Sequence, residues 1–223
     1  MMNAYLSRRA FFARVLRYSS AAALAMSFGF EASARCRGKV QSTALLYATR
    51  YGATKETARW VRKGMDTPAD VLDIERVSIP EVLAGYDRFI VGSGIWIKGA
   101  HPKVLEFFQT GRDTLQERLL GTFIVCGSAD GSETGKELVE HYLHLMHAPL
   151  SARPPLSRAF GGRLVVGRLS DGDREKLAAF YRNYLNQELR DWDLTDSGKA
   201  NVFGNEIEDI LARTPAAPLQ KAG

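Results

Sequence analysis

The chain has 223 residues, of which 45% are hydrophobic and 25% are charged, a composition typical of a single α/β domain with short additions. Of the net charge of +5, the first 34 residues supply four arginines and one glutamate, so the rest of the chain is close to neutral. This balance argues against nucleic-acid binding, and no run approaches the roughly 20 apolar residues that a transmembrane helix needs.

The first 34 residues have the pattern of an export signal. The basic stretch MMNAYLSRRAFFARVL is followed by the small, apolar stretch YSSAAALAMSFGF and by Ala32-Ser33-Ala34, which matches a cleavage site. The core Ser7-Arg8-Arg9-Ala10-Phe11-Phe12 resembles a twin-arginine signal, which implies contact with the export machinery and a periplasmic or otherwise exported protein. An ordinary secretory signal and an uncleaved interfacial anchor are the alternatives. Residues 35–42 are then a linker.

Short apolar runs alternate with helical patterns over residues 43–191. We predict strands at 43–48, 69–74, 88–92, 121–126 and 162–167, and helices at 53–65, 102–109, 133–146 and 171–191. Strands that are nearly all apolar and alternate with helices indicate a parallel sheet with helices on both faces. Five such strands suit the doubly wound order 2-1-3-4-5, in which ligands bind beyond the carboxyl ends of the strands, beside strand 1.

The end of the chain is predicted to be an extension of this domain. Residues 192–223 contain one short helical pattern at 206–212, and the proline-rich stretch 214–218 is expected to fray.

The turn after the first strand has the chemistry of a phosphate site. There Thr49-Arg50-Tyr51-Gly52-Ala53-Thr54 leads into a helix, whose first turn offers free N–H groups and the positive end of its dipole. Two threonine hydroxyls add donors, the glycine permits close approach, and Arg50 or Lys55 balances charge. The turn matches neither the lysine loop of nucleotide hydrolases nor the G-x-G-x-x-G pattern. The alternative is that these residues only cap the helix.

Two further glycine-bearing loops follow the third and fourth strands. In VGSGIWIKGAHPKVLEFF, Val91 to Phe108, glycines permit the approach of a flat ligand and Trp96 is placed to stack on it. In CGSADGSETGK, Cys126 to Lys136, backbone groups are placed to bind a polar ring edge. A core or partner-facing tryptophan and a plain flexible loop are the alternatives. The predicted topology brings all three loops to the same edge of the sheet.

These loops resemble those of the flavodoxin-like family, in which a Thr/Ser-x-x-Gly-x-Thr turn after strand 1 binds the FMN phosphate. The resemblance covers about Ala44 to Asn186. Within it, three features are similar to the flavodoxin-type, menaquinone-dependent protoporphyrinogen oxidases. These are GSGIWIKG after the third strand, LEFF at the end of the next helix, and RAFGGRL at the start of the fifth strand.

The resemblance implies FMN as the cofactor and assigns residues to it. The phosphate is expected at Thr49, Arg50, Tyr51, Gly52, Ala53 and Thr54, the ring beside Ser93, Gly94, Ile95, Trp96 and Lys98, and its polar edge at Cys126, Gly127 and Ser128. The loop after strand 4 lacks the tyrosine that often covers the second flavin face in electron-carrier flavodoxins. The resemblance therefore implies one ring face that is open to a substrate or partner.

The histidines at 141, 144 and 147 are the strongest candidate for other chemistry, because two of them could share a metal ion. Leucine and methionine residues interleave with them and supply a buried face, so the histidines more simply line the solvent side. We predict no metal site.

The sequence thus predicts an exported, FMN-binding, flavodoxin-like redox protein that transfers electrons to or from membrane quinones or a redox-protein partner. Two alternatives stay open. One is a protoporphyrinogen-oxidase-like enzyme of haem biosynthesis, and the other is a flavodoxin-fold protein that lacks flavin and binds a partner.

Overall fold

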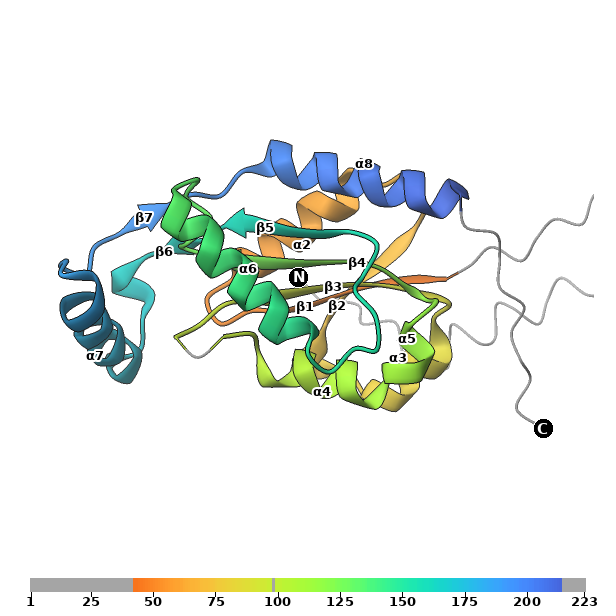
Figure 1. The fold of residues 1–223 in the computed structure, drawn as a ribbon, viewed down its shortest axis with the longest axis horizontal. Helices are drawn as coiled ribbons and strands as arrows, with labels where there is room; N and C mark the ends of the chain where they lie inside the picture. The colour runs from red at the N-terminus through yellow and green to blue at the C-terminus, as the bar shows by residue number, and fades with distance from the viewer. Residues whose placement is uncertain (1–41, 98, 214–223) are drawn as a thin grey trace, which may run out of the picture. The chain divides into compact units, whose positions relative to one another are not determined.

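A five-stranded parallel sheet forms the centre of the fold (Figure 1). The computed structural model describes residues 42–97 and 99–213, so the predicted export signal, most of the linker, Lys98 and residues 214–223 lie outside the described residues. The strand order is β2-β1-β3-β4-β5, and every neighbouring pair is parallel. This order confirms the predicted doubly wound, flavodoxin-like topology.

The three central strands are buried along nearly their whole length, as their apolar runs predicted. Consecutive side chains point to opposite faces, so Leu45 enters one core and Leu46 the other. The strands are β1 (Thr43–Ala48), β2 (Ala69–Asp73), β3 (Arg88–Gly94), β4 (Leu119–Cys126) and β5 (Ser157–Gly161).

Helices cover both faces of the sheet (Figure 1). On one face, Phe107 of α4 and Met146 of α6 pack into the first core; on the other, Val61 of α2 and Phe203 of α8 pack into the second. The helices are α2 (Ala53–Lys63), α3 (Ile79–Gly85), α4 (Pro102–Thr110), α5 (Arg112–Leu115), α6 (Glu133–His147), α7 (Asp171–Phe180) and α8 (Ser197–Arg213), with a 3₁₀ turn η1 (Ile74–Arg76) after β2. The short helices α3 and α5 were not predicted.

The prediction of the fifth strand at 162–167 is wrong. The strand that pairs with β4 is β5, five residues earlier, and its Phe160 is buried in the second core. The chain leaves the sheet at Gly161, where a Cβ would lie 2.1 Å from the carbonyl oxygen of Leu194. The predicted residues form instead a two-residue strand, β6 (Arg163–Leu164), and a 3₁₀ turn, η2 (Val166–Arg168).

The predicted helix at 171–191 is shorter and does not cover the sheet. α7 ends at Phe180 and continues as one π turn, η3 (Tyr181–Leu185), which stops at Asn186 because that residue has a positive φ of 51°. Leu177 is buried, as expected, but Tyr184 is 78% exposed and Leu185 is also exposed. These side chains lie outward because no sheet lies beneath this helix.

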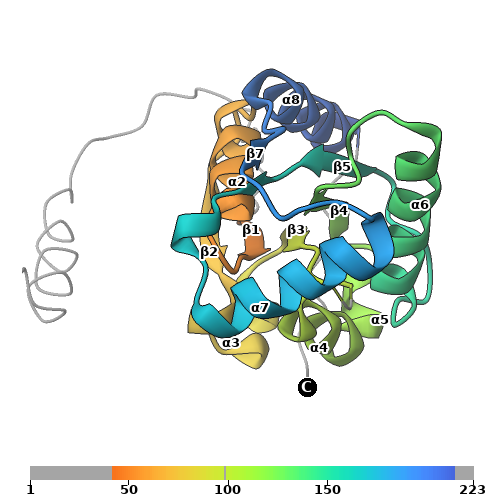
Figure 2. The same ribbon diagram turned by 90° about the vertical axis from the view of Figure 1, so that its left-hand side faces the viewer.

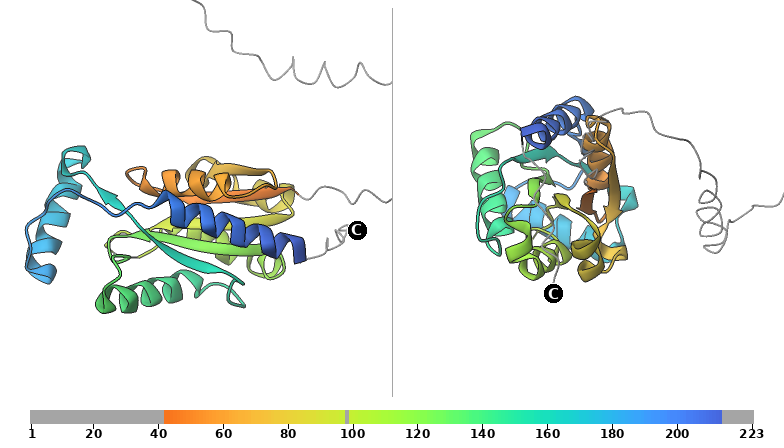
Figure 3. Two further views of the ribbon diagram at one scale, coloured as in Figure 1. Left: turned by 90° about the horizontal axis from the view of Figure 1, so that it is seen from above. Right: turned by 90° about the vertical axis from the view of Figure 1, so that its right-hand side faces the viewer.

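The helix that covers the sheet beside α2 is α8, which spans far more than the predicted 206–212. Phe203 and Ile207 are almost fully buried against β4 and β5. α8 (blue) runs alongside α2 (orange) in Figure 3. The sheet therefore depends on residues beyond 191, where we placed the end of the domain.

The described residues include no helix that is both long enough and apolar enough to cross a membrane.

Candidate functional site

The turn after β1 leaves the start of α2 open to an anion. Gly52 is the N-cap residue, with φ 96° and ψ −14°, and it offers no side-chain acceptor to the first turn. Nothing lies within 4 Å of the place where its Cβ would be. Thr49 Oγ1 accepts a hydrogen bond of 3.0 Å from Gly52 N, which closes the loop on itself. Uncapped N–H groups at a helix start favour phosphate binding.

Thr54 lies where this loop meets the loop after β3. Its side chain is almost fully buried, and a Cβ on Gly94 would lie 2.8 Å from Thr54 Oγ1. A residue without a side chain is therefore required at 94 for the two loops to approach this closely. Four predicted site residues, Thr49, Gly52, Thr54 and Gly94, therefore lie close together where the loops after β1 and β3 meet.

The loop after β3 is held by its own polar contacts. Ser93 is fully buried, and its Oγ accepts a hydrogen bond of 2.9 Å from His101 N. Ile95 N donates to Val125 O at 2.9 Å, and Trp96 and Gly99 exchange backbone hydrogen bonds in a tight turn. Ser93 and Ile95 thus shape the loop, while Trp96 lies at its tip, half-buried.

The loop after β4 begins with a buried residue and ends in an exposed one. Burial raises the pKa of the Cys126 thiol, which keeps it protonated and suits a core position. A Cβ on Gly127 would lie 3.2 Å from the ring of Trp192, and Ser128 is partly exposed. This loop therefore faces a tryptophan that the sequence did not assign to the site.

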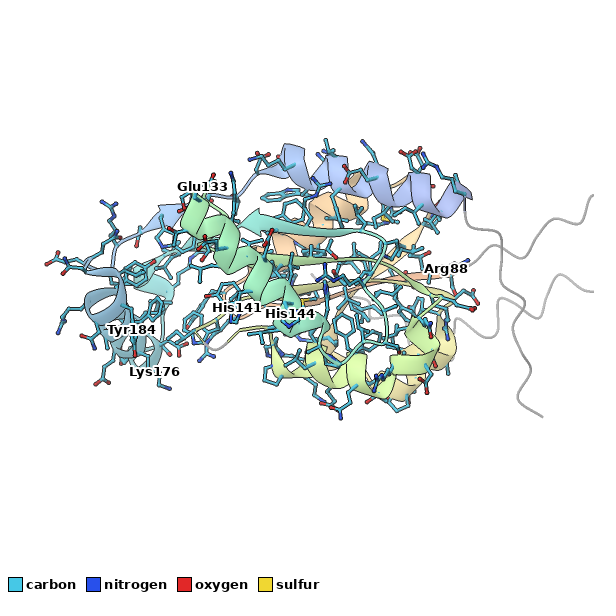
Figure 4. The ribbon with its side chains drawn as sticks, in the orientation of Figure 1. Arg88, Glu133, His141, His144, Lys176 and Tyr184 are labelled. Carbon is cyan, nitrogen blue, oxygen red and sulfur yellow. The ribbon has the colours of Figure 1, made fainter. Side chains whose placement is uncertain are left out.

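That tryptophan belongs to an insertion between β5 and α8, which we call the cap (residues 162–196). It contains β6, η2, α7, η3 and a short strand β7 (Trp192–Asp193), and β6 pairs with β7 in antiparallel fashion. Figure 2 looks along the sheet from its carboxyl edge and shows α7 crossing in front of the strands. In Figure 4, Tyr184 of the cap and Arg88, at the start of β3, lie at opposite ends of the fold.

The cap contacts the phosphate loop through one carboxylate. Arg50 Nε and one Nη each donate to Asp173 at 2.6 Å, and Tyr51 Oη donates to the same carboxylate. The hydrogen bonds from Arg50 first, and from Tyr51 second, lower the pKa of Asp173. The Arg50 guanidinium also lies 4.7 Å above the ring of Trp96. Arg50 and Tyr51, predicted at the phosphate, therefore direct their side chains to the cap.

Asp173 and Trp192 were not predicted as site residues. Asp173 reads as an ordinary acid at a helix start, and Ser170 Oγ does accept from Asp173 N there. The length of chain between β5 and the last helix was the available clue, but the predicted helix at 171–191 was placed against the sheet. Only the tertiary structure brings residues 50 and 173 together.

The residues at the loops fit FMN. The N-terminus of α2 presents uncapped N–H groups beside two threonine hydroxyls, which suits a phosphate dianion. Trp96 and Gly127 lie at the same edge of the sheet, where Trp96 packs against the buried leucines of the cap and Trp192 lies against Gly127. Ala53 follows the N-cap, so its backbone N–H belongs to this first turn.

The histidines of α6 lie away from these loops. His141 and His144 are exposed on α6 (Figure 4), and among the described residues no three His, Cys, Asp or Glu side chains gather as metal ligands do. A groove of about 390 Å³ runs beside α6. It is lined by Glu140, Leu143, His144, His147, Arg153, Pro154 and Ser157.

Comparisons with known proteins give a family match and similar solved structures. A family model described as a flavodoxin domain matches residues 44–188. One similar solved structure is a WrbA-like flavodoxin from Agrobacterium tumefaciens, with 16% identity and a TM-score of 0.44 over 78% of this chain and 99% of that chain. Another is a Streptococcus pneumoniae flavodoxin, with 12% identity and a TM-score of 0.47 over 78% of this chain and 99% of that chain. The Megasphaera elsdenii flavodoxin is a third, with 13% identity and a TM-score of 0.45 over 75% of this chain and 98% of that chain. No curated protein matches the chain in sequence.

Proposed function

We propose that the chain, which belongs to the flavodoxin domain family, transfers electrons to or from a quinone or another redox protein. From the pattern of its first 34 residues we also propose that it is exported. Flavodoxins bind FMN, so family membership confirms the predicted cofactor. When bound, FMN supplies the electron-carrying chemistry, and the protein supplies anchoring, orientation and electrostatics.

The observation that carries this proposal is the open start of α2. Backbone N–H groups of its first turn, with the hydroxyls of Thr49 and Thr54, are the groups that would hold the phosphate. Gly94 keeps the second loop close to Thr54, and Trp96 lies at the tip of that loop. Together these residues anchor the phosphate and orient a ring at the carboxyl edge of the sheet.

An FMN titration of the purified protein tests this proposal. We expect flavin absorption bands near about 375 and 450 nm in the loaded protein. Thr54→Val should weaken FMN binding by roughly 10- to 100-fold, because a hydrogen bond to a charged group is lost. Thr57→Val is the matched control, because Thr57 is equally buried but bonds to Ala53 O within α2. A colourless protein, or equal affinities for both variants, would contradict the proposal and favour a flavin-less partner-binding protein.

A porphyrinogen-oxidising enzyme is the second candidate. It is supported by the stretches GSGIWIKG, LEFF and RAFGGRL, which resemble those of the flavodoxin-type protoporphyrinogen oxidases. Turnover of protoporphyrinogen with a quinone as acceptor distinguishes this enzyme from an electron carrier. Electron exchange without porphyrinogen turnover would leave the carrier as the function.

Export through the twin-arginine route is the remaining part of the proposal. Arg8→Lys with Arg9→Lys keeps the charge of the signal but removes the arginine pair, so the protein should be retained in the cytoplasm. Cell fractionation measures this, with Arg14→Lys and Arg17→Lys as the control pair. Unchanged export of the first variant would favour an ordinary secretory signal.

A further inference from the structure

The cap is a closed unit that is fixed to the fold at its base. β6 and β7 pair there, with Arg163 opposite Asp193 and Leu164 opposite Trp192. Arg163 also forms an ion pair with Glu56 of α2. The base of the cap is therefore tied to the helix whose N-terminus forms the phosphate site.

The inner side of the cap is completed by residues from the flavin loops. Its buried apolar residues are Leu164, Leu169 and Leu177, and Tyr51 and Trp96 pack against them from the loops after β1 and β3. Three buried leucines are far too small a core to be stable alone. The cap therefore depends on those loops for its packing.

Asp173 is the polar centre of this contact. It is 4% exposed, whereas Asp171, two residues earlier on α7, is fully exposed. A buried carboxylate is stable only when it is fully paired, and here Arg50 and Tyr51 supply the donors. Both donors lie between Thr49 and Gly52, inside the loop whose backbone forms the phosphate site.

From this juxtaposition we propose that Asp173 is a positioning residue that couples closure of the cap to FMN binding. The inference rests on the proposed function for its ligand. Phosphate binding fixes the backbone of residues 49–54 and so holds Arg50 and Tyr51 in place for Asp173. By thermodynamic reciprocity, docking of Asp173 holds the loop in the form that binds phosphate.

The coupling is tested with Asp173→Asn, which keeps the side-chain size and removes the charge. The matched control is Asp171→Asn, on the same helix turn but in solvent. Limited trypsin digestion after Arg182 and Arg190 reports opening of the cap, because Arg182 lies within η3 and Leu189, next to Arg190, packs against the buried leucines of the cap. FMN affinity is measured in parallel by quenching of flavin fluorescence.

We expect Asp173→Asn to speed cleavage at these two sites and to raise the Kd for FMN, each on the order of tenfold. FMN should slow cleavage of the wild-type cap and have a smaller effect in Asp173→Asn. Asp171→Asn should behave as the wild type within about twofold. Equal cleavage of the two variants, or faster cleavage when FMN is added, would overturn the coupling.

A second variant separates loss of coupling from loss of folding. Tyr51→Phe removes one donor to Asp173 and leaves the Asp173 carboxylate paired with Arg50. The fold should therefore persist while trypsin cleavage of the cap increases by several-fold. Cleavage at wild-type rate in this variant, with Asp173→Asn unfolded by circular dichroism, would also overturn the proposal. Failure of the proposed function is distinguishable from failure of the coupling. Wild-type protein that binds no FMN contradicts the proposed function, whereas trypsin cleavage of the FMN-free variants still tests the contact between Asp173 and the loop after β1.

Discussion

Gly52 fixes the backbone of the phosphate loop by a conformation that other residues rarely adopt. Its φ of 96° turns the chain from β1 into α2, and its surroundings are open. The need for glycine here is therefore one of backbone conformation and not of space.

Gly52→Ala should lower the free energy of unfolding by about 1–2 kcal/mol, because a Cβ is strained at this φ. FMN affinity should fall as well, since the strained loop relaxes away from the phosphate-binding form. Gly85→Ala is the control: its surroundings are equally open, but its φ is not positive. Urea denaturation of both variants measures the difference, and equal stabilities would show that the loop adapts without strain.

His147 is a second residue whose environment sets a measurable property. Burial, followed by the positive charge of Arg153 and by His144, lowers its pKa to about 4. His147 Nε2 lies 2.8 Å from Thr122 Oγ1, a contact that joins the end of α6 to β4. Between about pH 6.5 and pH 4, His147 is therefore protonated in the unfolded chain but neutral in the folded chain.

Stability should therefore fall as the pH drops from about 6.5 to about 4, and His147 should contribute no pH dependence above that range. His147→Gln keeps a polar contact with Thr122 and removes the titration, so its stability should be flatter across this window. Urea midpoints at pH 7 and pH 4.5 measure the change. A wild-type decline that persists unchanged in His147→Gln would assign it to other groups.

At the residue scale, the sequence predicted what local chemistry determines. Thr49, Gly52 and Thr54 lie within one turn of chain between a strand and a helix, so their grouping follows from secondary structure alone. Asp173 was not predicted because its partner Arg50 is remote in the sequence and no periodic pattern joins them. Residues that lie close together in the sequence could therefore be grouped from the sequence alone, whereas the contact between Arg50 and Asp173 could not.

At the scale of elements, the strands before β5 were placed well because each is one short stretch, mostly apolar in β1, β3 and β4, with no second candidate beside it. The fifth failed because two short candidates, SRAFG and GRLVVG, lie next to each other. Phe160 enters the second core, whereas Leu164 packs with Leu169, Leu177, Trp96 and Trp192 in what we call the cap cluster. Only pairing with β4 distinguishes the two stretches. The length of α8 was missed because Gly198 and Gly204 interrupt its helical pattern.

Gly204 also sets how closely α8 approaches α2. A Cβ at this position would lie 2.2 Å from the carbonyl oxygen of Val61, a backbone atom that cannot move aside. Gly204→Ala should therefore lower the free energy of unfolding by about 1–3 kcal/mol, as overpacking does. Gly198→Ala, on an exposed turn of the same helix, should be neutral or slightly stabilising. Thermal melts compare the two, and equal melting temperatures would mean that the helices separate at little cost.

At the scale of the whole fold, the topology was predictable because alternating apolar strands and helices admit few arrangements. The cap was not, because it repeats the same signals on a smaller scale: a short apolar strand, a capped helix and buried leucines. It was therefore read as the last β-α unit of the sheet. In the structure, β5 completes the sheet, and the cap that follows it covers the carboxyl edge of the sheet.

Two titrating groups should make these units respond to acid in different pH ranges. His147 belongs to the sheet and loses its contribution between about pH 6.5 and 4. The pKa of Asp173 is lowered by Arg50 and Tyr51, so its contribution to cap docking is complete above the ordinary aspartate pKa of about 3.9 and is lost as the pH falls below it. The cap should thus stay docked through the range in which the sheet loses stability.

Tryptophan emission measures this order of events in a Trp60→Phe background, where the remaining tryptophans, Trp96 and Trp192, both lie in the cap cluster. Their emission should be constant from pH 7 to about pH 4 and shift to longer wavelength below it, as water reaches the opened cluster. In Asp173→Asn the shifted emission should already be present at pH 7, because no carboxylate pairs with Arg50 at any pH. A shift that begins near pH 6 and disappears with His147→Gln would instead mean that cap and sheet open as one cooperative unit.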